Sequence, residues 1–360
     1  MKLIIAGGGT GGHLFPALAI ARAVMAEDPN SSILFVGTRH GIEARIIPET
    51  EFPIHFITAR GIRRTGAVST LRAIVEIPFG VMQSIRVIRE FRPSIVLGVG
   101  GYASGPTLAA AVLARIPTAI QEQNSIMGTT NRLLMRFAGR VFISWEKTDP
   151  APPTGKTILA GNPIREDLFD PPLRPKRGDG LNILIFGGSR GARSINLAVT
   201  QNLDLLLPVS GRFSLLHQTG YGVADEVKES YHRAGIEADV REFINDMAQA
   251  YAWADLVVCR SGASSVAELT ALGKPAILIP YPYAIGDHQT RNAVLLQTAG
   301  AARVLRDQEL KNGKLAKEIR SIVEKPHVLD EMAESSRKLG RPEAASIIAR
   351  ALIDLERSRN

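Results

Sequence analysis

The sequence contains a single cysteine, Cys259, among 360 residues. One thiol excludes an intrachain disulfide and every C-x-x-C redox or zinc motif, and it fits a reducing compartment. Because Cys259 ends a short apolar run, its simplest interpretation is a small buried apolar residue.

Long apolar runs are also missing from the chain. The first run after Met1 and Lys2 covers only residues 3–6, which is too short for the apolar core of a signal peptide. The run at 105–114 is followed by Arg115 and Pro117, so it falls short of the roughly 20 residues that cross a bilayer. We therefore expect neither export nor a membrane-spanning helix.

Metal-binding motifs are absent as well. No aspartate lies two positions from another, so no D-x-D pair is available to hold a metal under a sugar nucleotide. Histidine and cysteine spacings give no zinc site, and the phosphate-loop motif G-x-x-x-x-G-K-[ST] does not occur. We therefore expect no metal or other cofactor, while help from a divalent cation is left open.

Basic residues outnumber acidic ones, with a net charge of +8 that favours polyanions, anionic lipid or phosphorylated substrates. Seven arginines and two glutamates lie among apolar residues between positions 60 and 92. Helical spacing alone favours a helix with a core-facing stripe and a solvated basic edge. The alternative is a basic amphipathic surface that contacts anionic lipid. Nothing resembles the aromatic and basic interleaving of a nucleic-acid binder.

Short apolar runs alternate with glycine-bearing turns and helix-length segments along the chain. This alternation predicts parallel strands joined by crossover helices, and the length favours two domains over one. A proline- and glycine-rich stretch at 171–180 interrupts the pattern, which restarts at LNILIFGGSRGARSIN. The sequence therefore predicts two doubly wound α/β domains with ligands at the carboxyl ends of their strands. The last segment, 328–357, is helical throughout and has no strand pattern.

The first glycine turn, GGGTGGH at 7–13, matches the dinucleotide fingerprint G-x-G-x-x-G. The carboxylate that would bind a ribose is missing, because the second strand ends in Thr38 and Arg39. The turn therefore indicates a phosphate site at a helix N-terminus rather than an NAD site. His13 follows the turn, where an imidazole could accept a proton from an attacking alcohol or could merely cap or pack.

Later turns carry further polar groups. Ser189 lies in the second glycine turn, where backbone N–H groups suit a diphosphate, although a tight turn without ligand is the alternative. Glu268 lies inside the helix after VVCRSG, either to bind two ribose hydroxyls or as a surface glutamate. Asn124 and Gln289 follow strands, and their amides suit sugar hydroxyls.

Seven motifs in series resemble the MurG family of bacterial glycosyltransferases, over residues 3 to about 300. They are GGTGGH at 8–13, GGYASGP at 100–106, EQN at 122–124, GNPIR at 161–165, GGSRGA at 187–192, CRSGASSVAE at 259–268 and DHQTRNA at 287–293. The resemblance implies a GT-B fold of two Rossmann-like domains. Its implied boundaries are 1–160 for the first domain, completed by a helix at about 340–360, 161–180 for a linker, and 181–339 for the second domain.

The resemblance also implies roles for residues. In the second domain, Ser189 would take the diphosphate of UDP-N-acetylglucosamine, Ile244 the uracil and Glu268 the ribose, while Gln289 and Asn124 would take the sugar. Arg165 would line the donor site as well. The remaining implied residues are Thr10, Gly11 and Gly12 near the reaction centre, Gly101 and Tyr102 on the acceptor side, and His13 as the base.

The implied reaction is inverting transfer of N-acetylglucosamine to the muramoyl hydroxyl of undecaprenyl-pyrophosphoryl-MurNAc-pentapeptide, which is lipid I, to give lipid II for peptidoglycan. A lipid-linked acceptor implies a peripheral place at the cytoplasmic face of the cell membrane, and it favours lipid contact for residues 60–92. Cell-wall synthesis and division proteins are further implied partners, and no nucleic acid is expected. A UDP-N-acetylglucosamine 2-epimerase and a non-catalytic nucleotide-sugar binding subunit are the alternatives.

Two positions depart from the family pattern. Gln121 stands where members often have histidine, so no role is carried over to it. Arg190 stands where glutamine is common, which adds positive charge beside the expected diphosphate.

Overall fold

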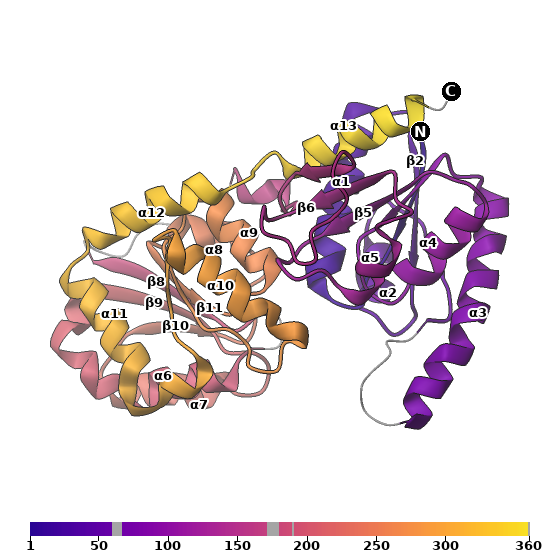
Figure 1. The fold of residues 1–360 in the computed structure, drawn as a ribbon. Coiled ribbons are helices and arrows are strands. Elements are labelled where there is room, and N and C mark those ends of the chain that lie inside the picture. The colour runs from indigo at the N-terminus through magenta and orange to yellow at the C-terminus, as the bar shows by residue number, and fades with distance from the viewer. Residues whose placement is uncertain (60–66, 171–179, 189–190, 359–360) are drawn as a thin grey trace. The chain divides into compact units, whose positions relative to one another are not determined.

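The computed structural model describes residues 1–59, 67–170, 180–188 and 191–358, with only the backbone for 67–75 and 285 (Figure 1). The chain forms two compact units, Met1–Arg165 with Arg341–Asn360, and Glu166–Gly340. Residues 161–165, expected in the linker, therefore belong to the first unit. The next residues form the 3-10 turn η2 (Glu166–Leu168), which packs on a helix of the second unit. Residues 171–179 of the expected linker lie outside the described part.

The first unit contains a parallel sheet with the order β3-β2-β1-β4-β5-β6-β7. Its strands are β1 (Lys2–Ala6), β2 (Ser32–Gly37), β3 (Ile54–Phe56), β4 (Ile95–Gly98), β5 (Thr118–Glu122), β6 (Arg140–Ile143) and β7 (Thr157–Leu159). Its helices are α1 (Gly11–Glu27), α2 (Glu43–Ile46), α3 (Ala67–Phe91), α4 (Ser104–Leu113), α5 (Thr129–Leu134) and α13 (Ala344–Arg357).

Helices cover both faces of this sheet, which is why its strands are almost continuously apolar. Leu3 and Ile5 of β1 pack in the cluster that contains α1 and α13. Ile4 and Ala6 point the other way, into the cluster that contains α3 and α4. Because successive side chains of a strand alternate between faces, one apolar strand supplies two cores.

The second unit contains a parallel sheet with the order β10-β9-β8-β11-β12-β13. Its strands are β8 (Leu181–Phe186), β9 (Phe213–Gln218), β10 (Ala238–Arg241), β11 (Leu256–Cys259), β12 (Ala276–Leu278) and β13 (Ala302–Val304). Its helices are α6 (Arg193–Thr200), α7 (Ala224–Arg233), α8 (Met247–Trp253), α9 (Ala263–Ala271), α10 (His288–Thr298), α11 (Lys314–Glu324) and α12 (Val328–Leu339).

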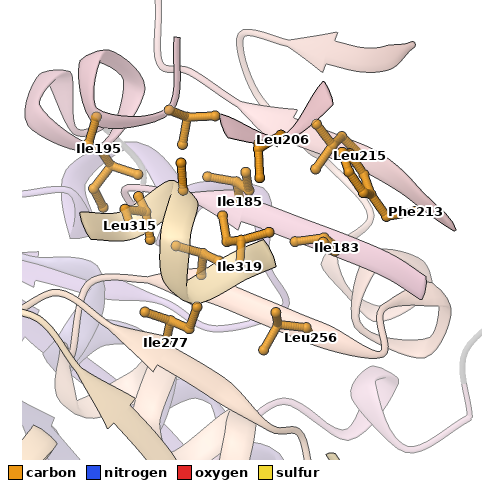
Figure 2. Close-up of a cluster of buried hydrophobic side chains, with 14 of the residues drawn as sticks. Ile183, Ile185, Ile195, Leu206, Phe213, Leu215, Leu256, Ile277, Leu315 and Ile319 are labelled. Carbon is orange, nitrogen blue, oxygen red and sulfur yellow. The ribbon is translucent and has the colours of Figure 1, made fainter. Parts of the chain in front are cut away.

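The core of the second unit lies between one face of this sheet and helices α6, α7 and α11. Figure 2 shows Ile183 and Ile185 of β8 against Leu315 and Ile319 of α11. Phe186, on the opposite face, meets the ring of Tyr251 from α8 edge-on at a centroid distance of 6.1 Å. Two doubly wound α/β domains, as predicted, are thereby confirmed.

The segment 328–357 is two helices rather than one. It breaks at Gly340, which α12 reaches as its C-cap, and Pro342 follows two residues later. α12 belongs to the second unit, where the Ser336 hydroxyl donates to the carbonyls of Leu269 and Lys274. α13 belongs to the first unit and packs on α1 (Figure 1). No helix of the described part is long and apolar enough to cross a bilayer.

Candidate functional site

The first unit gathers its polar loops at the carboxyl ends of β1, β4 and β5. These three strands are neighbours, and the strand order reverses between β1 and β4. Such a switch point separates the loops and leaves a crevice at the sheet edge where α/β proteins bind ligands. The loops after the three strands are residues 7–10, 99–103 and 123–128 respectively, and the first leads into α1, which carries His13.

The glycine loop 7–9 leads directly into α1. Gly7, Gly8 and Gly9 have φ of 156°, 131° and 87°, and the last two values lie in the region that favours glycine. Thr10 is the N-cap in an extended conformation, and its carbonyl accepts from the N–H groups of His13 and Leu14, both at 3.2 Å. The first turn of α1 therefore begins at Gly11 and Gly12, and its N-terminal dipole favours an anion there.

His13 lies on this first turn, half-buried, with Nδ1 3.2 Å from Oε1 of Gln123. The amide of Gln123 is oriented by its own NH₂ group, which donates to the carbonyl of Val99 at 2.7 Å and to Oε1 of Gln121. Oε1 of Gln123 is thus an acceptor, so Nδ1 of His13 carries the proton in the neutral ring. Nε2 is then the basic nitrogen, as a general base requires.

The loop after β4 packs against both the glycine loop and His13. Gly101 has φ of 81°, and a side chain there would overlap the backbone of Gly8. A side chain at Gly100 would come within 2.9 Å of the His13 ring. Tyr102 follows and is 45% exposed, so it remains open to a ligand. Asn124 lies after β5, half-buried, with its backbone N–H donating to Glu122 at 3.1 Å.

Arg165 is the last residue of the first unit. Its guanidinium lies 5.8 Å from the centre of the Phe15 ring on α1. The structure therefore places Arg165 beside the glycine-loop helix of its own unit.

The second unit repeats the arrangement at the carboxyl ends of β8 and β11. Gly187 leaves no room for a side chain beside Ala192, and Gly191, with φ of 72°, approaches the carbonyl of Thr219. Ser189 and Arg190 lie outside the described residues. The turn therefore has the close backbone packing of a phosphate-binding loop, with α6 starting at Arg193.

Gln218, at the end of β9, joins this turn to the segment that contains Ile244. Its NH₂ group donates to the carbonyl of Gly188 at 3.0 Å, and its Oε1 accepts from the N–H of Ile244 at 2.9 Å. Gln218 and Ile244 are both 3% exposed. The side chain of Ile244 is buried and its backbone N–H is already donated to Gln218, so a base at this position would meet the other main-chain groups of the segment.

Glu268 is half-buried on α9, and its Oε2 accepts from the hydroxyl of Tyr251 at 2.8 Å. Tyr251 is fully buried, so this carboxylate is not a freely solvated surface group. Cys259 is fully buried too, which confirms its prediction as a core residue. Burial, and then the negative charge of Glu268, raise the pKa of the Cys259 thiol well above its usual range.

Gln289 is the second residue of α10, and its side chain is oriented by the loop after β12. Its Oε1 accepts from the N–H of Tyr281 at 2.9 Å, which leaves its NH₂ group as the donor side. Its carbonyl accepts from the hydroxyl of Ser261 at 2.9 Å. The described residues contain no group of three or more His, Cys, Asp or Glu that could hold a metal ion.

Two family models match the chain. The N-terminal domain model of glycosyltransferase family 28 matches residues 3–143, and its C-terminal domain model matches residues 182–348. The chain belongs to glycosyltransferase family 28. Among its curated relatives, the "UDP-N-acetylglucosamine--N-acetylmuramyl-(pentapeptide) pyrophosphoryl-undecaprenol N-acetylglucosamine transferase" of Geobacter sulfurreducens is 46% identical over 98% of each chain.

Solved structures agree with this family 28 membership. The crystal structure of Acinetobacter baumannii MurG has a TM-score of 0.80 with 29% identity and covers 98% of this chain and 99% of its own. UDP-GlcNAc 2-epimerase from Neisseria meningitidis has a TM-score of 0.68 with 14% identity, over 98% of this chain and all of its own. The second likeness concerns the fold alone. The expected glycosyltransferase family and GT-B fold class are thus confirmed.

Four residues that contact these loops were not singled out from the sequence: Gln123, Gln218, Tyr251 and Glu43, whose Oε2 accepts from the N–H of Gly9 at 2.6 Å. Gln123 sits beside the selected Asn124, and Gln218 ends an apolar strand. A buried polar residue must find a partner, so a glutamine at the end of an apolar strand (Gln218) or directly after one (Gln123) is the signal that could have marked both. Glu43 contacts Gly9, 34 residues away in the chain, and Tyr251 contacts Glu268, 17 residues away. No local sequence pattern indicates these contacts.

Proposed function

We propose that this chain transfers N-acetylglucosamine from UDP-N-acetylglucosamine to the muramoyl hydroxyl of the undecaprenyl-pyrophosphoryl-linked pentapeptide acceptor. The observation that carries this activity is 46% identity over 98% of both chains to a relative named for it. The product is lipid II, the disaccharide precursor of peptidoglycan.

The reaction is a single displacement. The acceptor hydroxyl oxygen attacks the anomeric carbon of the donor, the bond from that carbon to the UDP oxygen breaks, and the configuration inverts. Nε2 of His13 accepts the hydroxyl proton, because Gln123 holds the proton of the neutral ring on Nδ1. The bonding electron pair leaves with UDP, whose charge is stabilised by backbone N–H groups and helix N-termini.

Donor binding belongs to the second unit in this proposal. The turn at 187–192, which includes Ser189, takes the diphosphate, and the main chain at Ile244 takes the uracil. Glu268 binds the ribose hydroxyls, oriented by Tyr251. Gln289 offers its NH₂ group to the sugar. Asn124 and Arg165, which belong to the first unit, are further residues proposed to bind the donor. Thr10, Gly11 and Gly12 face a phosphate, and Gly101 and Tyr102 face the acceptor.

A lipid-linked acceptor requires contact with a membrane, and α3 offers a suitable surface. Ile77, Phe79 and Met82 are 42%, 55% and 61% exposed, which is unusual for large apolar side chains. Arg86 and Arg89 follow them on the exposed side of the same helix. Of the basic segment, residues 60–66 and the Arg72 side chain lie outside the described part.

Further large apolar side chains are exposed on and near α4 and α5. α3 packs on α4, and α4 packs on α5. Leu113, Leu133 and Phe137 near these helices are 71%, 57% and 56% exposed. Apolar side chains edged by arginines suit the anionic cytoplasmic leaflet of the cell membrane, which is the proposed location.

The membrane proposal predicts weaker vesicle binding by Phe79→Ala/Met82→Ala protein. Sedimentation with vesicles that contain anionic lipid should show at least about a five-fold loss of bound protein, because two inserted side chains are removed. Leu207→Ala, which truncates an exposed side chain of the second unit, is the matched control. Equal binding by wild-type and double-variant protein would contradict this surface.

Transfer of radiolabel from UDP-N-acetylglucosamine to the lipid-linked acceptor tests the activity itself. The proposal predicts labelled lipid product and free UDP in equal amounts, and no change in the donor when acceptor is omitted. Formation of the manno epimer from donor alone would instead indicate the epimerase. Donor binding without turnover would indicate a binding subunit.

A further inference from the structure

We propose that Glu43 is the positioning residue of the acceptor-side glycine loop, an internal carboxylate that occupies the Gly9 N–H and fixes the wall on which His13 rests. This inference rests on the proposed transfer reaction for its kinetic consequence, but not for its structural one. Glu43 does not contact a reacting atom in this proposal.

The carboxylate of Glu43 is buried and fully engaged. The residue is 2% exposed, at the start of α2. Its Oε2 accepts from the N–H of Gly9 at 2.6 Å. Its Oε1 accepts from the N–H and the hydroxyl of Thr38, at 2.9 and 3.0 Å. A buried charge is tolerated only with such partners, and the short distance to Gly9 fits a charge-assisted hydrogen bond.

Three glycines make room for this one side chain. A Cβ atom at Gly8 or Gly41 would overlap the carboxylate of Glu43, and one at Gly37 would overlap its Cγ. Gly37 and Gly41 do not belong to the 7–12 loop at all. Part of the glycine pattern that resembles a dinucleotide fingerprint therefore serves an internal acid rather than a ligand.

The acid also changes which groups can meet a substrate. A dinucleotide site places its carboxylate at the end of the second strand, directed at a ribose. Here the carboxylate comes six residues after Gly37 and is directed at the glycine loop. Because an anion already holds the Gly9 N–H, a substrate phosphate is left with the start of α1 at Gly11 and Gly12.

The loop that Glu43 holds supports the catalytic side of the unit. Gly101 packs against the backbone of Gly8, and Gly100 packs against the ring of His13. Glu43, loop 7–9, loop 100–101 and His13 therefore form one continuous line of contacts. Displacement of the first member should misplace the last, and a misplacement of about 1 Å can cost about 100-fold in rate.

Glu43→Gln tests the contact selectively. The N–H and the hydroxyl of Thr38 both donate to this side chain, so the amide oxygen of the new glutamine would face Thr38. Its NH₂ group would then face the N–H of Gly9, and two donors would lie opposite each other. We expect the Gly9 amide proton resonance, observed with glycine-selective ¹⁵N labelling, to move upfield. We expect kcat for transfer to fall about 10- to 100-fold, with the KM for UDP-N-acetylglucosamine within about two-fold of wild type.

Two further variants complete the experiment. Thr38→Val removes one hydrogen bond to Glu43 but keeps the Gly9 contact, so kcat and the Gly9 resonance should stay near wild type. Gly41→Ala displaces the carboxylate by steric overlap without a substitution in the 7–12 loop, and should reproduce the effect of Glu43→Gln even if that variant folds poorly.

An unchanged Gly9 resonance and unchanged kcat in both Glu43→Gln and Gly41→Ala would overturn the proposal. A lower kcat together with a higher KM for the donor, to the same extent in all three variants, would also overturn the proposal, since this result would indicate a general folding role. Failure of the transfer reaction is distinguishable, because wild-type protein would then give no product while the Gly9 resonance would still report the contact.

Discussion

Two histidines of this chain occupy opposite environments, and that contrast separates chemistry from packing at the scale of single residues. His13 is half-buried beside an amide oxygen at the edge of the first sheet. His217 is fully buried in the second unit, where Nδ1 lies 2.9 Å from the Tyr231 hydroxyl and Nε2 lies 3.2 Å from Oδ1 of Asn196. The proposed function therefore assigns proton transfer to His13 and a packing role to His217.

Gln123→Glu should shift the pH dependence of transfer. A carboxylate beside Nδ1 of His13 favours the imidazolium, so it should raise the pKa of His13 and move the acidic limb of the kcat/KM profile up by about one pH unit. The measurement is kcat/KM from pH 5.5 to 9. Gln123→Met, which removes the acceptor without adding charge, should lower the rate and leave the limb near its wild-type position. An unmoved limb in Gln123→Glu would show that His13 is not the base.

His217 should make stability depend on pH. Burial lowers the pKa of His217 to about 3, while in the unfolded chain it is about 6.5. Between these two pKa values the unfolded state binds a proton at His217 and the folded state does not. The free energy of unfolding therefore falls as pH drops from about 6.5 toward 3. Urea unfolding of wild-type protein should lose about 2 kcal/mol more between pH 7 and 5 than that of His217→Gln. The same loss in both proteins would contradict this assignment.

Single residues differ in how far the sequence could predict them. His13, Thr10 and the glycines follow a strand and open a helix, so a local pattern was enough to select them. The Gln123 contact joins positions 110 residues apart, and its role depends on which side of the amide faces His13. The missing acid after the second strand excluded an NAD site, but the acid that replaces it could be found only in the fold.

At the scale of elements, the strands were predictable because each strand of a doubly wound sheet is buried on both faces. The helical pattern of 328–357 did not by itself mark a division, although Gly340 and Pro342 are both stop signals, whereas the family resemblance implied a separate last helix at about 340–360. The two helices then serve different units, because α12 packs on α9 and α13 packs on α1. Amphipathic periodicity gives a helix an apolar face but does not say which partner covers that face.

Ile348→Ala should destabilise the first unit. Ile348 is fully buried in the cluster shared by α13, α1 and the sheet, so its truncation should leave a cavity and cost about 2 to 4 kcal/mol. Arg350→Ala on the same helix is the control, since it removes only an exposed ion pair with Glu27 at 2.7 Å and should cost less than about 1 kcal/mol. Chemical unfolding measures both variants, and equal small losses would contradict the packing assigned to α13.

At the scale of the whole molecule, the chain contains two units of similar construction to which the proposed function gives different roles. Both contain a parallel sheet, a glycine turn and a helix start at a switch point. The first keeps a histidine after its glycine turn, whereas the second keeps a buried tyrosine–glutamate pair suited to a ribose. In the proposed function, the same fold thus provides a base in one unit and a nucleotide site in the other.

The most direct test of this division measures donor affinity and transfer rate on the same His13→Ala protein. Calorimetry with UDP-N-acetylglucosamine should give a Kd within about two-fold of wild type, because His13 is assigned to the acceptor hydroxyl and not to donor binding. Radiolabel transfer to the lipid-linked acceptor should fall at least about 100-fold, because the base is lost. Transfer at the wild-type rate, or loss of donor binding together with transfer, would contradict the account.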